Sequence, residues 1–361
     1  MNFDLSDEQR MLGEAVAGFL EKRSIPQGDA RAQWRQLCEL GLVALPFDAE
    51  HGGIEGGPVE HMIVLQALGG ALALDPYLSC AVMAGSALHR LADETLKREL
   101  LPRFASGDAI VAWSHEDSGA LRASRTANGW TLHGERPLVL GGGLADRVLV
   151  SAAVDGGDGW GVFLVDPAQA GVVRKAYRMP DGHDAADLKF DNVQAQHAVG
   201  TPGQMRPHID WVQSRGLAAL SAEAVGAMSA CLRTTVDYLN VRQQFGVPLS
   251  TMQSLQHKVA DMQVELELSR SMMMLAAASC DMDDAAQRNK TLSAAKARIG
   301  RAARHVGQEA VQLHGGMGMT EDCKAGHYLR RLVVIDILFG DADEHLQRLA
   351  DAGGLIEPAP F

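Results

Sequence analysis

The chain has 361 residues and a formal net charge of −12 at pH 7. Hydrophobic residues make up 47% of it and aromatic residues only 5%, a balance rich in alanine, leucine and methionine that favours helices. The negative charge argues against binding to nucleic acid or to anionic lipid, because both require a basic surface. A chain of this length is expected to fold as two or three packed units.

The first residues and the cysteines indicate the compartment. The opening MNFDLSDEQR is acidic and its apolar residues are dispersed, so it resembles neither a signal peptide nor a transit peptide. No run of about 18 apolar residues occurs, and we therefore expect no membrane-spanning segment. The five cysteines are odd in number and lack metal-ligand spacing, which is typical of reduced, buried thiols. These features predict a cytoplasmic protein.

The first 110 residues have the pattern of a helical unit. Ser6, followed by Glu8 and Gln9, supplies capping groups for the first helix. A glycine-rich turn occupies residues 51–57. Hydrophobic spacing predicts helices over four segments: 4–23, 30–41, 59–74 and 94–104.

The pattern changes after residue 110. Short runs with β character, separated by Gly, Asp and Asn turns, lie at 130–134, 147–153, 161–165 and 188–190. Strands this short predict a small antiparallel barrel or sandwich rather than βαβ units. From about 205 to 350 long helical stretches return, at 217–239, 255–278 and 285–313. We therefore predict an α+β multidomain chain with a helical domain, a β domain and a helical bundle, at 1–110, 111–204 and 205–361.

Two motifs that follow long predicted helices suit a phosphate-bearing ligand. The first is Arg242-Gln243-Gln244-Phe245-Gly246, followed by Gln253 and Gln256. An arginine beside exposed amides binds phosphate well, although an arginine at a helix end can simply neutralise the terminal carbonyls. The second, Gln312 to Gly318, has three glycines in four positions. Glycines let a ligand approach the backbone closely, but a plain glycine C-cap is the alternative.

Two other segments carry no chemistry by themselves. Residues 92–102, with Ser106-Gly107-Asp108, have the pattern of a surface helix and turn. Leu338 to His345 is a short acidic turn before a final helix, and we expect it to be solvated.

In order and spacing, these segments resemble the acyl-CoA dehydrogenase family over nearly the whole chain. The resemblance rests on the opening helix 5–19, the turn Leu45-Pro46-Phe47…His51-Gly52-Gly53, and the segments 92–107, 242–246 and 312–318. It implies a helical N-terminal domain, a middle β-barrel, a C-terminal four-helix bundle and FAD as cofactor. Residues 222–226 and 338–343 are most similar to the small subunit of pimeloyl-CoA dehydrogenase-type enzymes, which works beside a larger homologous subunit.

The resemblance implies a reaction whose usual base is missing here. In the family, a carboxylate removes the α-proton of an acyl-CoA thioester while hydride passes from the β-carbon to the flavin. The usual glutamate precedes the glycine of a Y-E-G-T turn. Counted from Arg330, that glycine is Gly340, so the glutamate position holds Phe339, which cannot accept a proton. Asp341 and Glu223 are possible substitutes, although Glu223 has the alternative of a polar contact inside the bundle.

Three other regions depart from the family pattern. Some members place the base near the start of the long helix, but residues 213–217 contain no carboxylate. The family's T-E-P-x-A-G-S-D segment is recognisable only in outline as Ser114 to Ala120. Its W-x-T segment, which lies against the flavin, is Leu138-Val139-Leu140. Most groups that would hold this chain's own isoalloxazine are therefore absent.

The retained motifs imply contacts to a neighbour's cofactor. In dimers of the family, R-x-x-F-G and Q-x-h-G-G reach the pyrophosphate and adenosine of FAD in the adjacent subunit. An aspartate at 341, where the family has a threonine near the cofactor, would repel a pyrophosphate bound in cis. The resemblance thus implies FAD contacts in trans from Arg242, Gln244, Phe245, Gln253, Gln312, Gly315 and Gly316.

Three functional hypotheses follow. The chain is the accessory subunit of an α,β-desaturating acyl-CoA dehydrogenase with a larger homologous partner, or a self-sufficient homodimer or tetramer with Asp341 as base, or a non-redox scaffold that binds acyl-CoA or a partner. The resemblance implies electron-transfer flavoprotein as acceptor. The acyl group is open between fatty, dicarboxylic and steroid types. Arg122, Arg125 and Arg136 could meet a second carboxylate, but scattered surface arginines are the plainer explanation.

Overall fold

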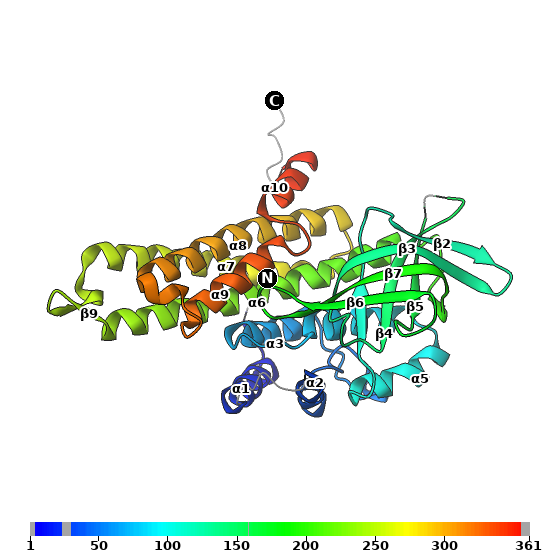
Figure 1. The fold of residues 1–361 in the computed structure, drawn as a ribbon, viewed down its shortest axis with the longest axis horizontal. Coiled ribbons are helices and arrows are strands. Elements are labelled where there is room, and N and C mark those ends of the chain that lie inside the picture. Colours follow the sequence, from blue (N-terminus) through cyan, green and yellow to red (C-terminus); the bar gives the residue numbers. More distant parts are fainter. Residues whose placement is uncertain (1–3, 24–29, 158, 355–361) are drawn as a thin grey trace. The chain divides into compact units, whose positions relative to one another are not determined.

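A computed structural model describes residues 4–23, 30–157 and 159–354. The chain divides into two compact units, each assembled from separated stretches of sequence. The first unit, which we call the bundle unit, comprises Met1–Ser24, Pro58–Ala73 and Leu217–Phe361. The second, the sheet unit, comprises Ile25–Gly57 and Leu74–Gly216. Figure 1 shows the elements of both.

The bundle unit is built from long helices. Its described elements are α1 (Asp7–Lys22), α3 (Pro58–Gly70), α6 (Arg206–Val241, from residue 217 onward), β9 (Gln243–Gln244), β10 (Val247–Pro248), η3 (Leu249–Thr251), α7 (Gln253–Ser279), α8 (Ala285–His314), η4 (Gly315–Met319), α9 (Lys324–Ile337) and α10 (Ala342–Asp351). The predicted capping of α1 is confirmed: Ser6 and Gln9 form a reciprocal capping box. Asp284 caps α8 with its side chain alone, which accepts from the N–H groups of Ala286 and Gln287.

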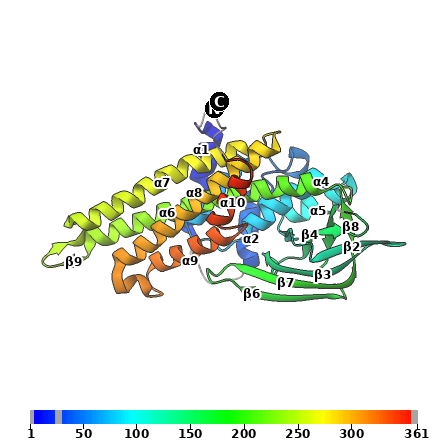
Figure 2. The same cartoon turned by 90° about the horizontal axis from the view of Figure 1, so that it is seen from above.

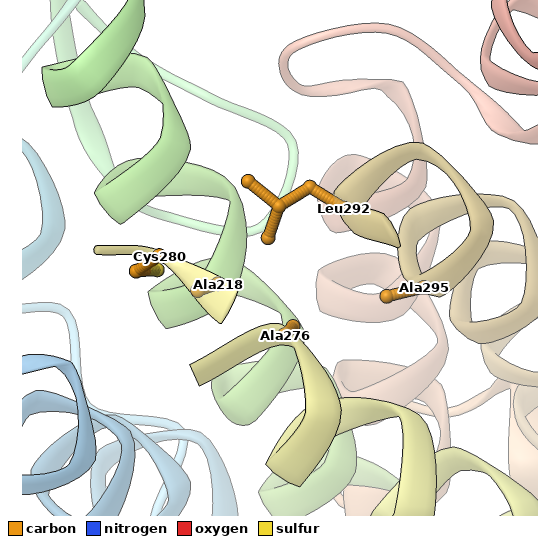
Figure 3. Close-up of a cluster of buried hydrophobic side chains, with 5 residues drawn as sticks. All are labelled: Ala218, Ala276, Cys280, Leu292 and Ala295. Carbon is orange, nitrogen blue, oxygen red and sulfur yellow. The ribbon is translucent and has the colours of Figure 1, made fainter. Parts of the chain in front are cut away.

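Apolar contacts and close helix crossings hold the bundle unit together. Small side chains from α6, the end of α7 and α8 meet around Leu292, as Figure 3 shows. Helices α3 and α6 cross at glycines: a Cβ on Gly226 would collide with the carbonyl oxygen of Gln66, and one on Gly69 with that of Glu223. The Tyr328 hydroxyl of α9 donates a 2.7 Å hydrogen bond to the Gly70 carbonyl.

The sheet unit combines short helices with a twisted sheet. Its described helical elements are α2 (Ala30–Glu39), η1 (Ala49–His51), the π-helical η2 (Leu78–Gly85), α4 (Ser86–Leu91) and α5 (Glu94–Ala105). The strands are β1 (Val111–Ser114), β2 (Leu121–Thr126), β3 (Gly129–Leu140), β4 (Arg147–Val154), β5 (Trp160–Val165), β6 (Val172–Arg178), β7 (Asp184–Gln194) and β8 (His197–Val199). The first residues of α6 also belong to this unit.

The described strands of the sheet unit form one eight-stranded sheet in the order β6-β7-β3-β2-β4-β5-β8, with β1 paired to β4. The prediction of a purely antiparallel arrangement is wrong in one respect. Strands β1 and β2 each run parallel to β4, while the other pairs are antiparallel. Because β1 and β4 are buried along much of their length, they lack the alternation that marks a half-exposed antiparallel strand.

Most element predictions agree with the structure, and two need correction. The predicted helices lie within one to four residues of α1, α2, α3, α5, α7 and α8, and 217–239 lies inside α6. The acidic turn from Leu338 is less solvated than expected, because Ala342 and His345 are buried in α10. The π-helical turn η2 was not predicted.

The cysteine and membrane predictions can be compared with the described residues. Cys38, Cys80, Cys231 and Cys280 are buried free thiols, as predicted, and Cys323 is half-buried. Among the helices in the described parts of the chain, none has the length and apolar character needed to cross a bilayer.

Candidate functional site

The link after α6 is a tight hairpin that exposes an aromatic ring. Gln244 pairs with Val247, which leaves Phe245 and Gly246 as a two-residue turn. Their φ angles of 56° and 79° are those of a type I′ turn, where asparagine and glycine are the usual residues. A left-handed phenylalanine is strained. Since Phe245 is 92% exposed, packing against the described residues does not explain an aromatic side chain there.

Three polar side chains near the same helix ends have unused hydrogen-bonding groups. Within residues 4–23, 30–157 and 159–354, the side chains of Arg242, Gln253 and Gln312 form no hydrogen bond or ion pair. At the end of α6 the Tyr238 carbonyl accepts a backbone hydrogen bond from the Arg242 N–H, so it does not need the Arg242 side chain. By contrast, the side-chain amide of Gln244 donates locally to the Gln243 carbonyl at 2.9 Å. The exposed guanidinium of Arg242 is therefore available to an anion.

Glycine occurs at positions 315 and 316, directly after α8, for different reasons. Gly315 is the C-cap, with φ 60° and ψ −142°, a conformation that only glycine adopts readily. The C-cap alternative therefore accounts for Gly315. Gly316 does not have a positive φ, and a Cβ there would meet nothing within 4 Å. Neither backbone conformation nor packing requires glycine at 316, so its small size leaves room for something outside the described chain.

The two links lie at one end of the bundle unit. The ring of Tyr238 on α6 stacks on that of His314 on α8, with centroids 4.4 Å apart. The β9 hairpin and the turn from α8 to α9 lie at the same end of the helices in Figures 1 and 2. We call this the bundle-end surface; it consists of Arg242, Gln244, Phe245, Gln253, Gln312, Gly315 and Gly316, all seven of the residues that the sequence singled out for FAD.

The turn between α9 and α10 is held by two buried ionisable side chains. The Lys296 ammonium donates to the carbonyls of Asp336 and Gly340, at 2.6 and 2.7 Å, and burial lowers the pKa of Lys296 to about 8. His345 Nε2 donates to the carbonyl of Phe339 at 3.1 Å. Burial lowers the pKa of His345 to about 4. These bonds fix Phe339 at φ 62°, a strained conformation for a large side chain.

Asp341 is occupied as a helix cap. Its carboxylate accepts from the N–H groups of Asp343 and Glu344, at 3.1 and 2.9 Å, at the start of α10. The hydrogen bond from Glu344, and that from Asp343, hold the pKa of the Asp341 carboxyl below its ordinary value despite partial burial. A carboxylate stabilised in this way is a weak base.

Glu223 is occupied by an ion pair. Its Oε1 accepts from Nε and Nη2 of Arg331, at 2.7 and 2.6 Å, and both side chains are almost fully buried. The alternative of a polar contact inside the bundle is therefore confirmed for Glu223. The Glu223 carboxylate is thus committed to balancing a buried guanidinium inside the bundle unit.

The Ser114 to Ala120 segment of the sheet unit is anchored by buried polar groups. The Ser151 hydroxyl lies 2.7 Å from His115 Nδ1. The guanidinium of Arg136 lies 3.3 Å from the Glu116 carboxylate and donates to the Ser151 carbonyl. Arg136 is fully buried, so the reading of it as a surface arginine is wrong: its strand β3 packs it inside the sheet unit.

The other two arginines considered for a second carboxylate have partners nearby. Arg122 pairs with Asp155 at 2.6 Å, and the guanidinium of Arg125 lies over the Trp130 ring at 5.3 Å. Both side chains are exposed. They are surface arginines engaged within the sheet unit.

Strand β3 has an irregularity where the family pattern has W-x-T. The pairing of β3 with β7 shifts register between Arg136 and Val139. At this bulge Leu138 has φ 50° and is exposed, and its N–H donates to the Asp187 carboxylate at 3.1 Å. Leucine supplies neither an indole nor a hydroxyl at this point.

Family models match both terminal parts of the chain. The model described as "Acyl-CoA dehydrogenase, N-terminal domain" matches residues 6–108, and "Acyl-CoA dehydrogenase, C-terminal domain" matches residues 214–354. The chain belongs to the acyl-CoA dehydrogenase family. Acyl-CoA dehydrogenases are oxidoreductases that use FAD, so the predicted enzyme class and cofactor are confirmed.

Relatives within the acyl-CoA dehydrogenase family match along nearly the full length. A probable acyl-CoA dehydrogenase of Bacillus subtilis (strain 168), YngJ, is 27% identical over 99% of this chain and 100% of its own. Isovaleryl-CoA dehydrogenase of Pongo abelii is 27% identical over 94% and 87%. A variant of the Tcur3481-Tcur3483 steroid ACAD has a TM-score of 0.87 at 26% identity, covering 96% of this chain and 97% of that chain. Butyryl-CoA dehydrogenase from Megasphaera elsdenii has a TM-score of 0.86 at 24% identity, covering 98% and 99%. The predicted fold is confirmed.

The residues present fit only part of the FAD that acyl-CoA dehydrogenases use. A pyrophosphate needs cations and N–H donors, and the bundle-end surface offers the unpartnered Arg242 with the side-chain amides of Gln253 and Gln312. The exposed ring of Phe245 and the open space at Gly316 suit a planar base. At the isoalloxazine wall, however, Leu138 offers only apolar atoms and its own backbone N–H is already used.

Sequence reasoning missed the buried residues that support these positions. Lys296 lies within the small-residue stretch Leu292-Ser293-Ala294-Ala295-Lys296-Ala297 of α8. A lysine placed among residues with helical core spacing was the available signal, because lysine is rarely buried without partners. His345 lies two turns into the acidic segment, and nothing in its neighbours indicated that it would turn inward.

Proposed function

We propose that this chain is the accessory subunit of an α,β-desaturating acyl-CoA dehydrogenase, and that its bundle-end surface completes the FAD site of a homologous partner subunit. The observation that carries the proposal is the contrast between two regions. On the bundle-end surface, Arg242, Phe245, Gln253 and Gln312 keep exposed groups that this chain does not itself use. The positions where a base belongs hold a phenyl ring, Phe339, and a capping carboxylate, Asp341.

The chain's own residues have a binding role in this proposal. Arg242 places a positive charge against the partner's pyrophosphate, while Gln253 and Gln312 offer amide N–H groups to it. Phe245 stacks on or packs against the adenosine, and Gly316 admits it at close range. Bound FAD supplies the hydride acceptor for the β-carbon. Proton removal belongs to the partner's own carboxylate, because neither Asp341 nor Glu223 is free to act.

Two observations bear on the partner and the compartment. The Tcur3481-Tcur3483 steroid ACAD, at 26% identity, carries two chain names, which favours a homologous larger subunit over a second copy of this chain. The free thiols are in keeping with a reducing cytoplasm. The substrate class is an acyl-CoA thioester, with electron-transfer flavoprotein as the acceptor by family.

The competing hypotheses predict different flavin contents. A self-sufficient homo-oligomer that uses Asp341 as base would carry FAD alone and would lose its flavin bleaching on Asp341→Asn. Asparagine caps a helix as well as aspartate does, so this variant keeps the cap of α10 and a loss of bleaching would report the missing carboxylate. A non-redox scaffold would carry no FAD under any condition.

The decisive experiment is purification of the chain alone and with homologous acyl-CoA dehydrogenase chains from the same genome. We expect the lone chain to be colourless, and a complex to be yellow and to bleach when an acyl-CoA substrate is added. A lone chain that is yellow and bleaches would contradict the proposal.

Arg233 on α6 and Arg242 directly after it provide matched variants. Arg242→Gln is expected to lower FAD retention in the complex by about tenfold, the cost of roughly 1.4 kcal/mol that a charge-assisted contact supplies. Arg233→Gln removes the same charge from an exposed position two to three turns earlier on the helix and should retain FAD. Equal retention in both variants would remove Arg242 from the cofactor site.

A further inference from the structure

The 3₁₀ turn after α8 holds two methionines out from the bundle unit. In η4, Met317 is 53% exposed and Met319 is 79% exposed. Gly318 between them is buried, and a Cβ there would lie only 2.7 Å from the Val311 carbonyl oxygen. The glycine brings the turn against α8, so the side chains on either side of it are left in solvent.

Hydrogen bonds fix the same turn. The Met317 carbonyl accepts from the Thr320 N–H at 3.0 Å and from the Thr320 hydroxyl at 2.8 Å. Gly315 begins the turn as the cap of α8. The exposure of these two thioethers therefore follows from a defined backbone conformation.

The two side chains differ from nearly all other methionines of the chain. The sequence contains 15 methionines. Within residues 4–23, 30–157 and 159–354, the exposed ones are Met11, Met317 and Met319. Met11 lies on α1, whereas the other two adjoin the bundle-end surface. Since oxidation of a thioether follows its access to solvent, these three sulfurs are the first targets of a dissolved oxidant among the methionines that the structure describes.

We propose that Met317 and Met319 form a peroxide-sensitive modification site that regulates the bundle-end surface. Each sulfur attacks one oxygen of hydrogen peroxide, the O–O bond breaks and an S–O bond forms. After proton transfer the other oxygen leaves as water. The sulfur loses two electrons and the peroxide gains them, so each step converts a thioether to a sulfoxide without another reactant.

The consequence rests on the proposed role of this surface in assembly. Val241, Phe245 and Val247 are also exposed at this end, so the methionines add to the exposed apolar side chains there. A sulfoxide is polar and disrupts methionine-containing interfaces, and it would have to lose its hydration on assembly. Free subunits are then the sensitive form, and assembled subunits are protected. Methionine sulfoxide reductase with a thiol reductant restores the thioethers.

The first measurement is a peptide map of the isolated chain during treatment with hydrogen peroxide. Met317 and Met319 are expected to oxidise at least about tenfold faster than Met273, which is buried on α7. Met11 is the exposed control away from the surface. Equal rates at Met317, Met319 and Met273 would overturn the inference by themselves.

The second measurement is association with the homologous dehydrogenase chain that co-purifies with it, before and after peroxide. Oxidation should weaken association about tenfold in the wild type and leave Met317→Leu/Met319→Leu unchanged. Reductase treatment should restore the wild type. Equal association before and after oxidation overturns the inference and leaves the proposed function standing. If no homologous chain associates before oxidation, the proposed function fails, and the modification site is then decided by the peptide map.

Discussion

His345 is held in its neutral form with one tautomer. Its Nε2 faces the Phe339 carbonyl, which can only accept, so Nε2 carries the proton and Nδ1 accepts from the Ser293 hydroxyl at 3.1 Å. Lys296 holds the next carbonyl along the same turn. The position of Phe339 therefore depends on the protonation of two side chains that never reach the surface.

Acid should weaken the fold through His345. Its pKa is lowered from 6.5 to about 4 by burial, so between these values the unfolded chain binds a proton that the folded chain does not. Stability from this group is complete above pH 6.5 and is lost as the pH falls toward 4, by about 3 kcal/mol. Urea unfolding of the wild type and of His345→Gln between pH 7 and 4 tests this expected loss of stability. The glutamine amide can still donate to Phe339 but does not titrate. A stability difference that stays constant from pH 7 to 4 would contradict the assignment.

The Glu223–Arg331 pair makes a separate prediction. Glu223→Gln leaves a buried guanidinium without its counter-charge, and we expect a loss of roughly 3–5 kcal/mol in the free energy of unfolding. The double variant Glu223→Leu/Arg331→Met should recover most of it, because it removes both charges. Chemical denaturation measures both. A loss below about 0.5 kcal/mol for Glu223→Gln, the usual scatter of surface substitutions, would show that the pair does not support the bundle.

At the residue scale, sequence patterns located the exposed groups better than the buried ones. Arg242 and Phe245 belong to short motifs whose residue types carry their chemistry, so their place in the sequence was enough to single them out. Lys296 donates to the Gly340 carbonyl, 44 positions away, and His345 donates to the carbonyl of Phe339 in the preceding turn. Such contacts depend on how α8, α9 and α10 pack, and this packing cannot be predicted from composition.

At the scale of elements, the crossing of α3 and α6 depends on two glycines. Gly226→Ala would drive a methyl group into the Gln66 carbonyl, and the helices could separate only by losing packing along both. We expect a loss of at least about 2 kcal/mol. Gly18→Ala on α1 is the matched control, since a Cβ there meets nothing within 4 Å. It should be neutral or stabilise by up to about 1 kcal/mol. Thermal unfolding of both variants measures these changes in stability. Equal melting temperatures would contradict the close crossing of α3 and α6 at Gly226.

Helices were predictable from sequence where their period and caps are local properties. Ser6 and Asp284 mark the starts of α1 and α8 by capping chemistry. The spacing of apolar residues predicts most of α6, α7 and α8. The π-helical turn Leu78–Gly85 was not predictable, because every residue in it is buried and no amphipathic face remains to show the period. The type I′ turn at Phe245 was hidden for another reason: phenylalanine is not a residue that this turn favours.

At the scale of the molecule, the two units are interleaved in sequence. The bundle unit draws on α1 and α3 as well as on the helices after residue 217. We expect a fragment spanning 205–354 to lack cooperative unfolding, because it exposes the α6 surface that α3 covers at Gly69 and Gly226. Circular dichroism during urea titration measures this, with the full chain as reference. A cooperative transition of the fragment would instead support the predicted independent domain from 205 to 361.

The whole-molecule prediction from sequence gave the order of helical, strand-rich and helical regions. The interleaving was not foreseen, because periodicity reports which face of a segment is buried and never which distant segment buries it. The parallel pairing of β1 and β2 with β4 was not predicted for the same reason.

The interleaving also constrains how the protein is made. Helix α3 carries the buried apolar side chains of Met62, Val64 and Leu65, and its face at Gln66 and Gly69 packs against α6, which is made much later. Roughly 150 residues must be synthesised between the end of α3 and residue 217. At ordinary ribosome speeds this takes about 7 to 30 s. During that interval the side of α3 that faces α6 is uncovered, so the yield in the cell should depend on a chaperone that shelters this segment until translation is nearly complete.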